Sequence, residues 1–387
     1  MPGMNLVKAS DLKSWSGSLA ARADLPGLIA SLIRSSCPTL QSYRFPSGDA
    51  SQTHGFDGVA EVVTETTFVP AGRSIWEFGT GENYEDKASS DFKKRTEEVS
   101  ADERAKQTFT FVTSRVWDGG PSNWEKERAS SGWLTVRALD ATSLELWLSD
   151  CPSVSLTLAK DLGIIPPTGI RTITDFWDEY RLNFDPVLKE ELLLTGREER
   201  AKRLCQALSE GIRGLSKWQA DSFAEAIAFI AASIMKTDAE TSAFLLSKTL
   251  IIEAAEIAQI VPTTNRFNFI LTPPAARVGP ALARTSQVTL ALGGDDRAGE
   301  AELLDRMNTR DFAAGLKSMG FDDEEAFRLA TRCGRSVTVL CRLNASAIAR
   351  PPAWHRDSAL VPFVLAGGWD ARNEYDRAAM EKLCGAS

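Results

Sequence analysis

Histidine is nearly absent from this sequence. The 387 residues contain only His54 and His355. A serine–histidine–aspartate catalytic triad and a zinc site built from several histidines are therefore improbable. Any metal chemistry of this chain has to rest on oxygen ligands, which hold hard cations such as Mg²⁺.

Paired cysteines and long apolar runs are also missing. The six cysteines form no CxxC pair, and in a chain of this length they indicate the reduced thiols of a cytosolic protein. No apolar run is long enough to cross a bilayer, and residues 1–15 lack the apolar core of a signal peptide. We therefore expect a cytoplasmic protein without a membrane partner.

The remaining composition is that of a globular protein. Hydrophobic residues make up 43% of the chain and charged residues 25%, and the length allows two or three domains. The net charge of −8 argues against a surface coated for non-specific DNA binding, although it leaves room for a local basic patch.

Two acidic residues lie on neighbouring segments with strand-like patterns. Asp57 lies two residues before a run rich in β-branched residues, 59–68, and Glu77 lies within the next run, 74–79. Residues 70–72 supply the turn, so the pattern predicts a β-hairpin. The two carboxylates then meet at one sheet edge, where they can share a divalent cation. The alternatives are an ordinary turn aspartate and a solvent-facing glutamate.

A charged helix is predicted at residues 84–99, directly after the hairpin. Its Lys87 can reach the acidic pair, where an ammonium group stabilises charge that develops on a phosphate. The alternative is a solvated helix face with ordinary lysine–aspartate pairs. A phosphate backbone also needs a basic flank beside the acids, and its candidate contacts are Lys93, Lys94, Arg95 and Arg115.

The predicted order of helix, three strands, helix and two strands, with these acids, resembles the PD-(D/E)XK nuclease superfamily. It resembles in particular the Mrr-like domains, with a restriction-endonuclease-like fold, at the N-termini of large bacterial defence proteins. The resemblance covers residues 25–163. It implies that Asp57 and Glu77 bind Mg²⁺ or Mn²⁺ and that a lysine completes the catalytic site. The usual lysine position is Gly79 here; some members supply the lysine from the following helix, which Lys87 matches.

The second half of the chain has a different pattern. Short apolar runs alternate with helical stretches, which predicts an α/β unit with a parallel sheet. Gly196-Arg197-Glu198 resembles the lead-in of P-loop NTPase modules of the STAND class. GxxxxGK[ST] is absent, however, and residues 217–225 supply neither the glycines nor the lysine of a phosphate loop. The predicted elements are a helix at 175–194 and strands at 249–252, 267–271 and 288–292.

We therefore predict an α/β protein with three regions. A restriction-endonuclease-like mixed sheet occupies residues 1–165, with a Pro- and Gly-containing boundary after it. A degenerate P-loop-NTPase-like α/β unit without Walker A follows at residues 170–300, and a helical region at 301–387. We also expect the chain to be the front part of a longer architecture.

The resemblance implies a metal-dependent DNA endonuclease that acts as an effector in bacterial anti-phage defence. Its partners would be DNA and either further copies of the chain or a phage-derived trigger. The alternative is a catalytically inactive module that binds nucleic acid or another partner, with the STAND-like unit as an assembly scaffold. A third reading is a nucleotide-dependent regulator with an unrecognised phosphate site.

Overall fold

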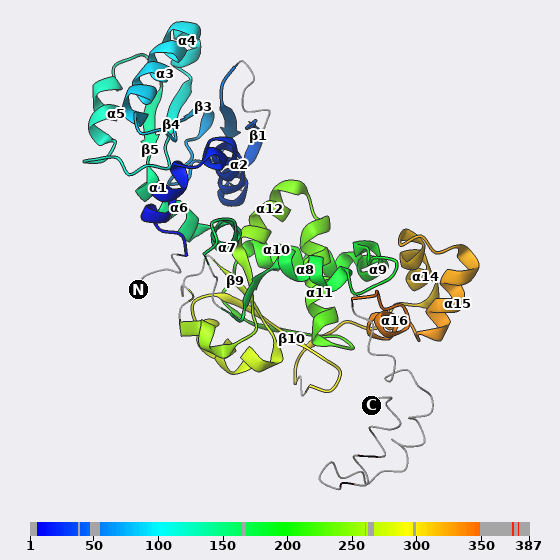
Figure 1. The fold of residues 1–387 in the computed structure, drawn as a ribbon. Coiled ribbons are helices and arrows are strands. Elements are labelled where there is room, and N and C mark those ends of the chain that lie inside the picture. The colour runs from blue at the N-terminus through cyan, green and yellow to red at the C-terminus, as the bar shows by residue number, and fades with distance from the viewer. Residues whose placement is uncertain are drawn as a thin grey trace.

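The computed structural model describes most of the chain up to residue 348. The described residues are 6–37, 39–46, 55–164, 168–259, 261, 267–296, 299–348, 374 and 378. They form an α/β structure with two β-sheets, one in the N-terminal half and one in the second half (Figure 1). His54, His355, Pro166, Pro167 and nearly all residues after 348 lie outside the described residues.

The N-terminal sheet is mixed, as predicted. Its strands lie side by side in chain order, and β1, β2 and β3 pair antiparallel whereas β3, β4 and β5 pair parallel. The bounds are β1 Leu40–Arg44, β2 Gly58–Val62, β3 Gly72–Phe78, β4 Gln107–Val112 and β5 Thr135–Leu139.

Helices cover both faces of this sheet. Alternation along β3 sends Trp76 and Phe78 to one face and Ile75 to the other. The first face packs against α1 Ala9–Ser16, α2 Leu19–Ser36, α6 Ala141–Asp150 and α7 Pro152–Asp161. The second packs against α3 Tyr84–Glu98 and α5 Ser122–Arg128, with the short α4 Ala101–Arg104 between them in sequence.

An aromatic cluster fixes β3 against the helices of the first face. Trp76 and Trp147 are fully buried, with ring centroids 6.4 Å apart, and Phe68 stacks on Trp147 at 5.1 Å. The indole nitrogen of Trp147 donates a hydrogen bond to Ser36 Oγ at 3.0 Å, so its polar end is satisfied. The strand that carries Glu77 is therefore held rigidly.

The predicted hairpin is shorter than its sequence pattern. The β2–β3 pairing ends where Val62 lies opposite Gly72, so the predicted strand to residue 68 is wrong beyond Val62. Residues 63–69 form a loop, in which the amide of Thr66 donates to the carbonyl of Val69 at 2.9 Å. The β-branched residues of this segment favour a strand, but their β-propensity is weak without a partner strand to pair with.

One predicted helix also differs from the structure, and α2 has a clear start. α2 begins at Leu19, where Ser18 Oγ accepts a hydrogen bond from the amide of Ala21 and caps the helix. The predicted helix at 175–194 is two helices, α8 Ile173–Arg181 and α9 Glu190–Leu194. Pro186 lies between them, where its missing N–H prevents helix continuation.

The second sheet is parallel except at one edge, where β6 pairs antiparallel with β8. The three predicted strands are confirmed, but the pattern missed β6, β7 and β11. The strand order is β11 Glu302–Leu303, β7 Gly214–Gln219, β10 Gln287–Leu292, β9 Asn268–Leu271, β8 Thr249–Ile252 and β6 Ile170–Thr172.

Helices surround the second sheet as well. One face packs with α8 and α9, and also with α10 Glu198–Glu210, α11 Phe223–Lys236 and the C-terminal helices α14 Thr309–Ser318, α15 Asp323–Arg332 and α16 Val337–Leu343. The other face packs with η2 Ala255–Gln259, η3 Pro273–Val278 and α13 Gly279–Leu282.

The two halves contact each other through α2 and α12 Ala239–Lys248. Ser247 Oγ donates to the carbonyl of Ser35 at 3.1 Å, and Lys248 Nζ donates to the carbonyl of Asp150 at 2.5 Å. Across the part of the chain that the structure describes, no helix combines the length and apolar character needed to cross a membrane.

Candidate active site

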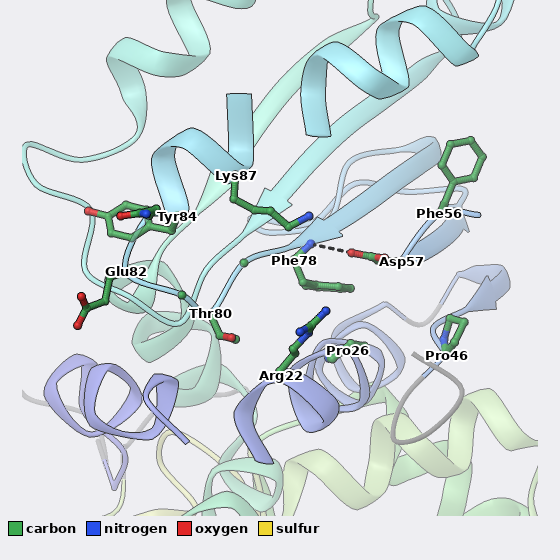
Figure 2. A pocket seen from close by; sticks show the side chains of 13 residues that line it. Arg22, Pro26, Pro46, Phe56, Asp57, Phe78, Thr80, Glu82, Tyr84 and Lys87 are labelled. Carbon is green, nitrogen blue, oxygen red and sulfur yellow. Dashed lines mark hydrogen bonds between the residues drawn. The ribbon is translucent and has the colours of Figure 1, made fainter. Parts of the chain in front are cut away.

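Asp57 and Glu77 lie at the same end of the β2–β3 pair. Gly58 is opposite Trp76, so the residue before Gly58 and the residue after Trp76 are neighbours across the two strands. The carboxylate of half-buried Asp57 accepts a hydrogen bond from the amide of Phe78 at 3.3 Å (Figure 2). This bond ties the loop before β2 to the end of β3, and the hairpin therefore brings the two predicted acids together.

Glu77 is held in an unfavourable place for a negative charge. Its side chain is 2% exposed, and burial raises its pKa to about 7. The negative charges of Asp57 and Asp91 raise the pKa further, whereas the hydrogen bond from Arg95 lowers it. A buried carboxylate with acidic neighbours favours a cation as a partner.

Arg95 occupies the interior of this site. The sequence prediction placed it on the nucleic-acid-binding flank, but it is 5% exposed, so its place on the surface was wrong. Its Nε donates to Glu77 Oε1 at 2.5 Å, and its terminal nitrogens donate to the Gly55 carbonyl at 2.5 Å and to Glu98 at 2.6 Å. Its guanidinium also lies 5.0 Å from the centre of the Phe56 ring. Arg95 thus connects α3, β3 and the loop that carries Asp57.

Lys87 comes from the first turns of α3. Its side chain is half exposed, and its Nζ lies 2.7 and 2.6 Å from the two carboxylate oxygens of Asp91. Asp91 is one helical turn further along and is largely buried. The ammonium group of Lys87 is therefore held in place by Asp91 rather than free to move.

Gly79 lies beneath the side chain of Lys87. A Cβ atom at this position would come within 2.7 Å of Phe111 Cζ and within 3.4 Å of Lys87 Cγ. A lysine at position 79 would therefore collide with Phe111, and the space beside the acids is taken by the lysine of the following helix. The packing therefore leaves no room for a larger side chain at position 79.

We expect Gly79→Ala to destabilise the fold. The added methyl group has to displace the Phe111 ring, so the free energy of unfolding should fall by about 1–3 kcal/mol. Denaturant titration measures the change. Gly81→Ala is the matched control, because a Cβ there meets no atom within 4 Å. Equal stability of the two variants would contradict the close packing at Gly79.

A pocket of about 570 Å³ opens beside these residues. Asp57 and Lys87 line it, together with Arg22 from α2, Thr80 and Tyr84 (Figure 2). Glu77 is not among the lining residues; it lies buried on the same strand end, beside Asp57. A ligand in the pocket thus meets the aspartate and the lysine directly.

The other basic residues that were predicted to contact nucleic acid do not form one cluster. Lys93 and Lys94 are exposed on α3, and Lys94 lies 4.0 Å from Glu98. Arg115 is half-buried, and its Nε donates to the carbonyl of Thr80 at 3.0 Å, which fixes the rim of the pocket. The sequence reasoning missed Arg22, which no motif marks, because its position beside the pocket depends on the packing of α2.

The donor set suits a hard cation that keeps most of its own water. In the described residue ranges, no group of three or more His, Cys, Asp or Glu side chains is arranged to hold a metal ion. Asp57 and Glu77 are the two carboxylates at this end of the β2–β3 pair, and Glu77 is ion-paired with Arg95. Mg²⁺ typically binds through one or two carboxylates, with water and substrate phosphate completing its octahedron, so this pair fits it.

No family model, no curated protein and no solved structure matches the chain.

Proposed function

We propose that the N-terminal half, residues 1–165, is a nuclease domain of the PD-(D/E)XK type that cleaves DNA with Mg²⁺ or Mn²⁺. The observation that carries this proposal is the convergence of Asp57, Glu77 and Lys87 at one end of the β2–β3 pair, beside an open pocket. The mixed sheet, with three antiparallel strands followed by a helix and parallel strands, supports the restriction-endonuclease-like resemblance.

In this proposal, each of the site residues has a different role in hydrolysis. Asp57 and Glu77 would hold the cation, which supplies Lewis-acid stabilisation and lowers the pKa of a bound water. In the reaction, water adds to phosphorus and one P–O ester bond breaks, leaving a phosphate monoester and an alcohol. Lys87, which lines the pocket with Asp57, stabilises the charge on the phosphate oxygens, and Asp91 holds its ammonium group in place.

One observation favours a second candidate function. Arg95 already neutralises Glu77 through a short, buried ion pair. If this pair persists when a cation is present, Glu77 is not a cation ligand, and the proposed pair of metal-binding carboxylates is reduced to Asp57. The domain would then be a non-catalytic module that binds nucleic acid or another partner.

Cleavage of supercoiled plasmid DNA distinguishes the two candidates. A nuclease nicks or linearises the plasmid with Mg²⁺ or Mn²⁺ and stops when EDTA removes the metal. Calorimetric titration with Mn²⁺ should detect binding to the wild-type protein and weaker binding to Glu77→Gln. Absence of both Mn²⁺ binding and cleavage would support the non-catalytic module.

Cleavage should depend on pH through Glu77. Its pKa is raised to about 7 by burial, and the cation binds the ionised carboxylate. Below pH 7 the proton competes with the cation, so the rate at limiting Mg²⁺ should rise by up to about tenfold per pH unit and level off above pH 7. Raising the Mg²⁺ concentration should move the midpoint to lower pH. A rate that stays constant between pH 6 and pH 8 would contradict the role of Glu77.

We propose that the second half is a STAND-like scaffold for assembly rather than an ATPase. Strand β7 runs into helix α11 through residues 220–222 alone. A phosphate loop instead places the longer GxxxxGK[ST] segment between strand and helix. Lys217 lies within strand β7, so it is not a phosphate-loop lysine. In this proposal the scaffold brings several nuclease domains together after a phage-derived trigger, in anti-phage defence.

ATP should not stabilise the protein. With no phosphate loop, we expect the same melting temperature with millimolar Mg²⁺-ATP as with AMP, which controls for ionic effects. A nucleotide present at about 100 times its Kd would add roughly 2.7 kcal/mol of stability. Differential scanning fluorimetry detects such a shift. A melting temperature that rises with ATP alone would refute the scaffold proposal in favour of a nucleotide-dependent regulator.

A further inference from the structure

Arg22 is an unpaired cation in the wall of the candidate active site. It lies near the start of α2, which forms the side of the pocket away from α3. In Figure 2 the side chains of Arg22 and Lys87 reach toward Phe78 from opposite sides. Arg22 is exposed, and it has no hydrogen bond or ion pair with any of the residues that the structure describes.

The packing of α2 explains why this arginine faces the pocket. Ala21, Leu25 and Ile29 are fully buried in the core under the sheet, which fixes the rotation of the helix. Arg22 and Pro26 are four residues apart, so they lie on one helix face, and both line the pocket. The position of Arg22 is therefore set by the core and does not depend on a flexible loop.

Two acids line the pocket, Asp57 and the exposed Glu82, and neither forms an ion pair with Arg22 in the part of the chain that the structure describes. Lys87 is paired with Asp91, and Arg95 with Glu77 and Glu98. The carboxylate of Asp57 accepts the Phe78 amide and is the proposed cation ligand. An arginine with free donors at the wall of such a site suits an oxyanion that enters from solvent, because its planar fork matches phosphate oxygens.

We propose that Arg22 is a substrate-positioning residue, which binds a backbone phosphate next to the one that is cleaved. The inference rests on the proposed nuclease function and adds the path of the substrate: the DNA strand passes between α2 and α3. Lys87 acts on the scissile phosphate, whereas Arg22 holds its neighbour and sets the register of the strand. Arg22 therefore contributes to binding and Lys87 to the chemical step.

The test compares Arg22→Ala with Arg22→Lys and with Arg213→Ala. Arg213 is a matched control, because it is exposed, lies in the second half of the chain and has no partner among the described residues. Binding of a short fluorescent DNA duplex is measured by anisotropy in EDTA over a series of salt concentrations. Arg22→Ala should weaken binding about tenfold and reduce the salt slope by about 1. Arg22→Lys should keep the slope and recover part of the affinity.

Steady-state cleavage gives the second readout. Arg22→Ala should raise KM about tenfold and leave kcat within about twofold, because the contact is the same in the ground and transition states. The inference is overturned if Arg22→Ala binds and cleaves like Arg213→Ala, if kcat falls at unchanged KM, or if the wild-type protein binds no DNA. Failure of the nuclease proposal has a different signature, namely that cleavage is absent or is unchanged by Asp57→Asn.

Discussion

Asp57→Asn is expected to abolish metal-dependent DNA cleavage while leaving the fold intact. The asparagine side-chain oxygen can still accept the hydrogen bond from the amide of Phe78, so the loop before β2 stays attached to β3. The negative charge that faces the pocket is lost, and with it one of the two proposed cation ligands. Cleavage should fall by at least about 10³-fold, the scale for losing an essential electrostatic contribution at the reacting centre.

The loss has to be separated from general damage to the hairpin. Glu61 is a matched control, since it lies on β2 of the same pair and is half-buried opposite Arg73. Glu61→Gln should cleave like the wild-type protein, and both variants should melt within a few degrees of it. Unchanged cleavage by Asp57→Asn would place the active site elsewhere, and equal loss in both variants would indicate a folding defect.

Lys87→Ala is expected to reduce turnover by about 10²–10³, the effect of removing one group that stabilises a transition state. The affinity for Mn²⁺ should change little, because Lys87 is not a ligand. Lys87→Arg should rescue only in part, since a planar guanidinium cannot replace a compact ammonium group that two oxygens of Asp91 hold at 2.6–2.7 Å. Single-turnover cleavage at saturating metal and DNA measures the chemical step.

Two controls make the Lys87 result specific. Lys202→Ala removes an exposed lysine that is ion-paired with Glu199 on α10, and it should leave the chemical step unchanged. Lys87→Ala also leaves the largely buried Asp91 without its ion-pair partner, so its stability should be measured by thermal melting alongside activity. Wild-type turnover in a folded Lys87→Ala protein would mean that another lysine acts, or that the domain is not a nuclease of this type.

Local sequence pattern located most of the elements around the site. Helix α3 begins at the predicted residue, and β3 ends within one residue of the prediction. The errors fall where a second interaction overrides local propensity. β2 is cut short because β3 offers no partner beyond Gly72, and β7 was missed because a strand of mixed polarity at this position has no clear period.

Only part of the candidate site could be predicted from the sequence. The pairing of the two neighbouring segments could be anticipated, but their register could not, because the predicted strand ran to residue 68 whereas the pairing ends at Val62 opposite Gly72. The role of Arg95 could not, because a charge on a polar helix normally indicates solvent. Its burial follows from the rotation of α3 on the sheet, which places it against Glu77.

The sequence by itself determined the alternation of strands and helices in the two halves, the scarcity of histidine, and the identity of the available acids and lysines. Only the tertiary structure determined where these side chains lie relative to one another. Packing around Phe111 leaves no room for a side chain at Gly79, so Lys87 fills that space. The buried residues of α2 fix the rotation of this helix, so that Arg22 lines the pocket. Both depend on contacts between residues far apart in the chain, and a local pattern carries no information about such distances.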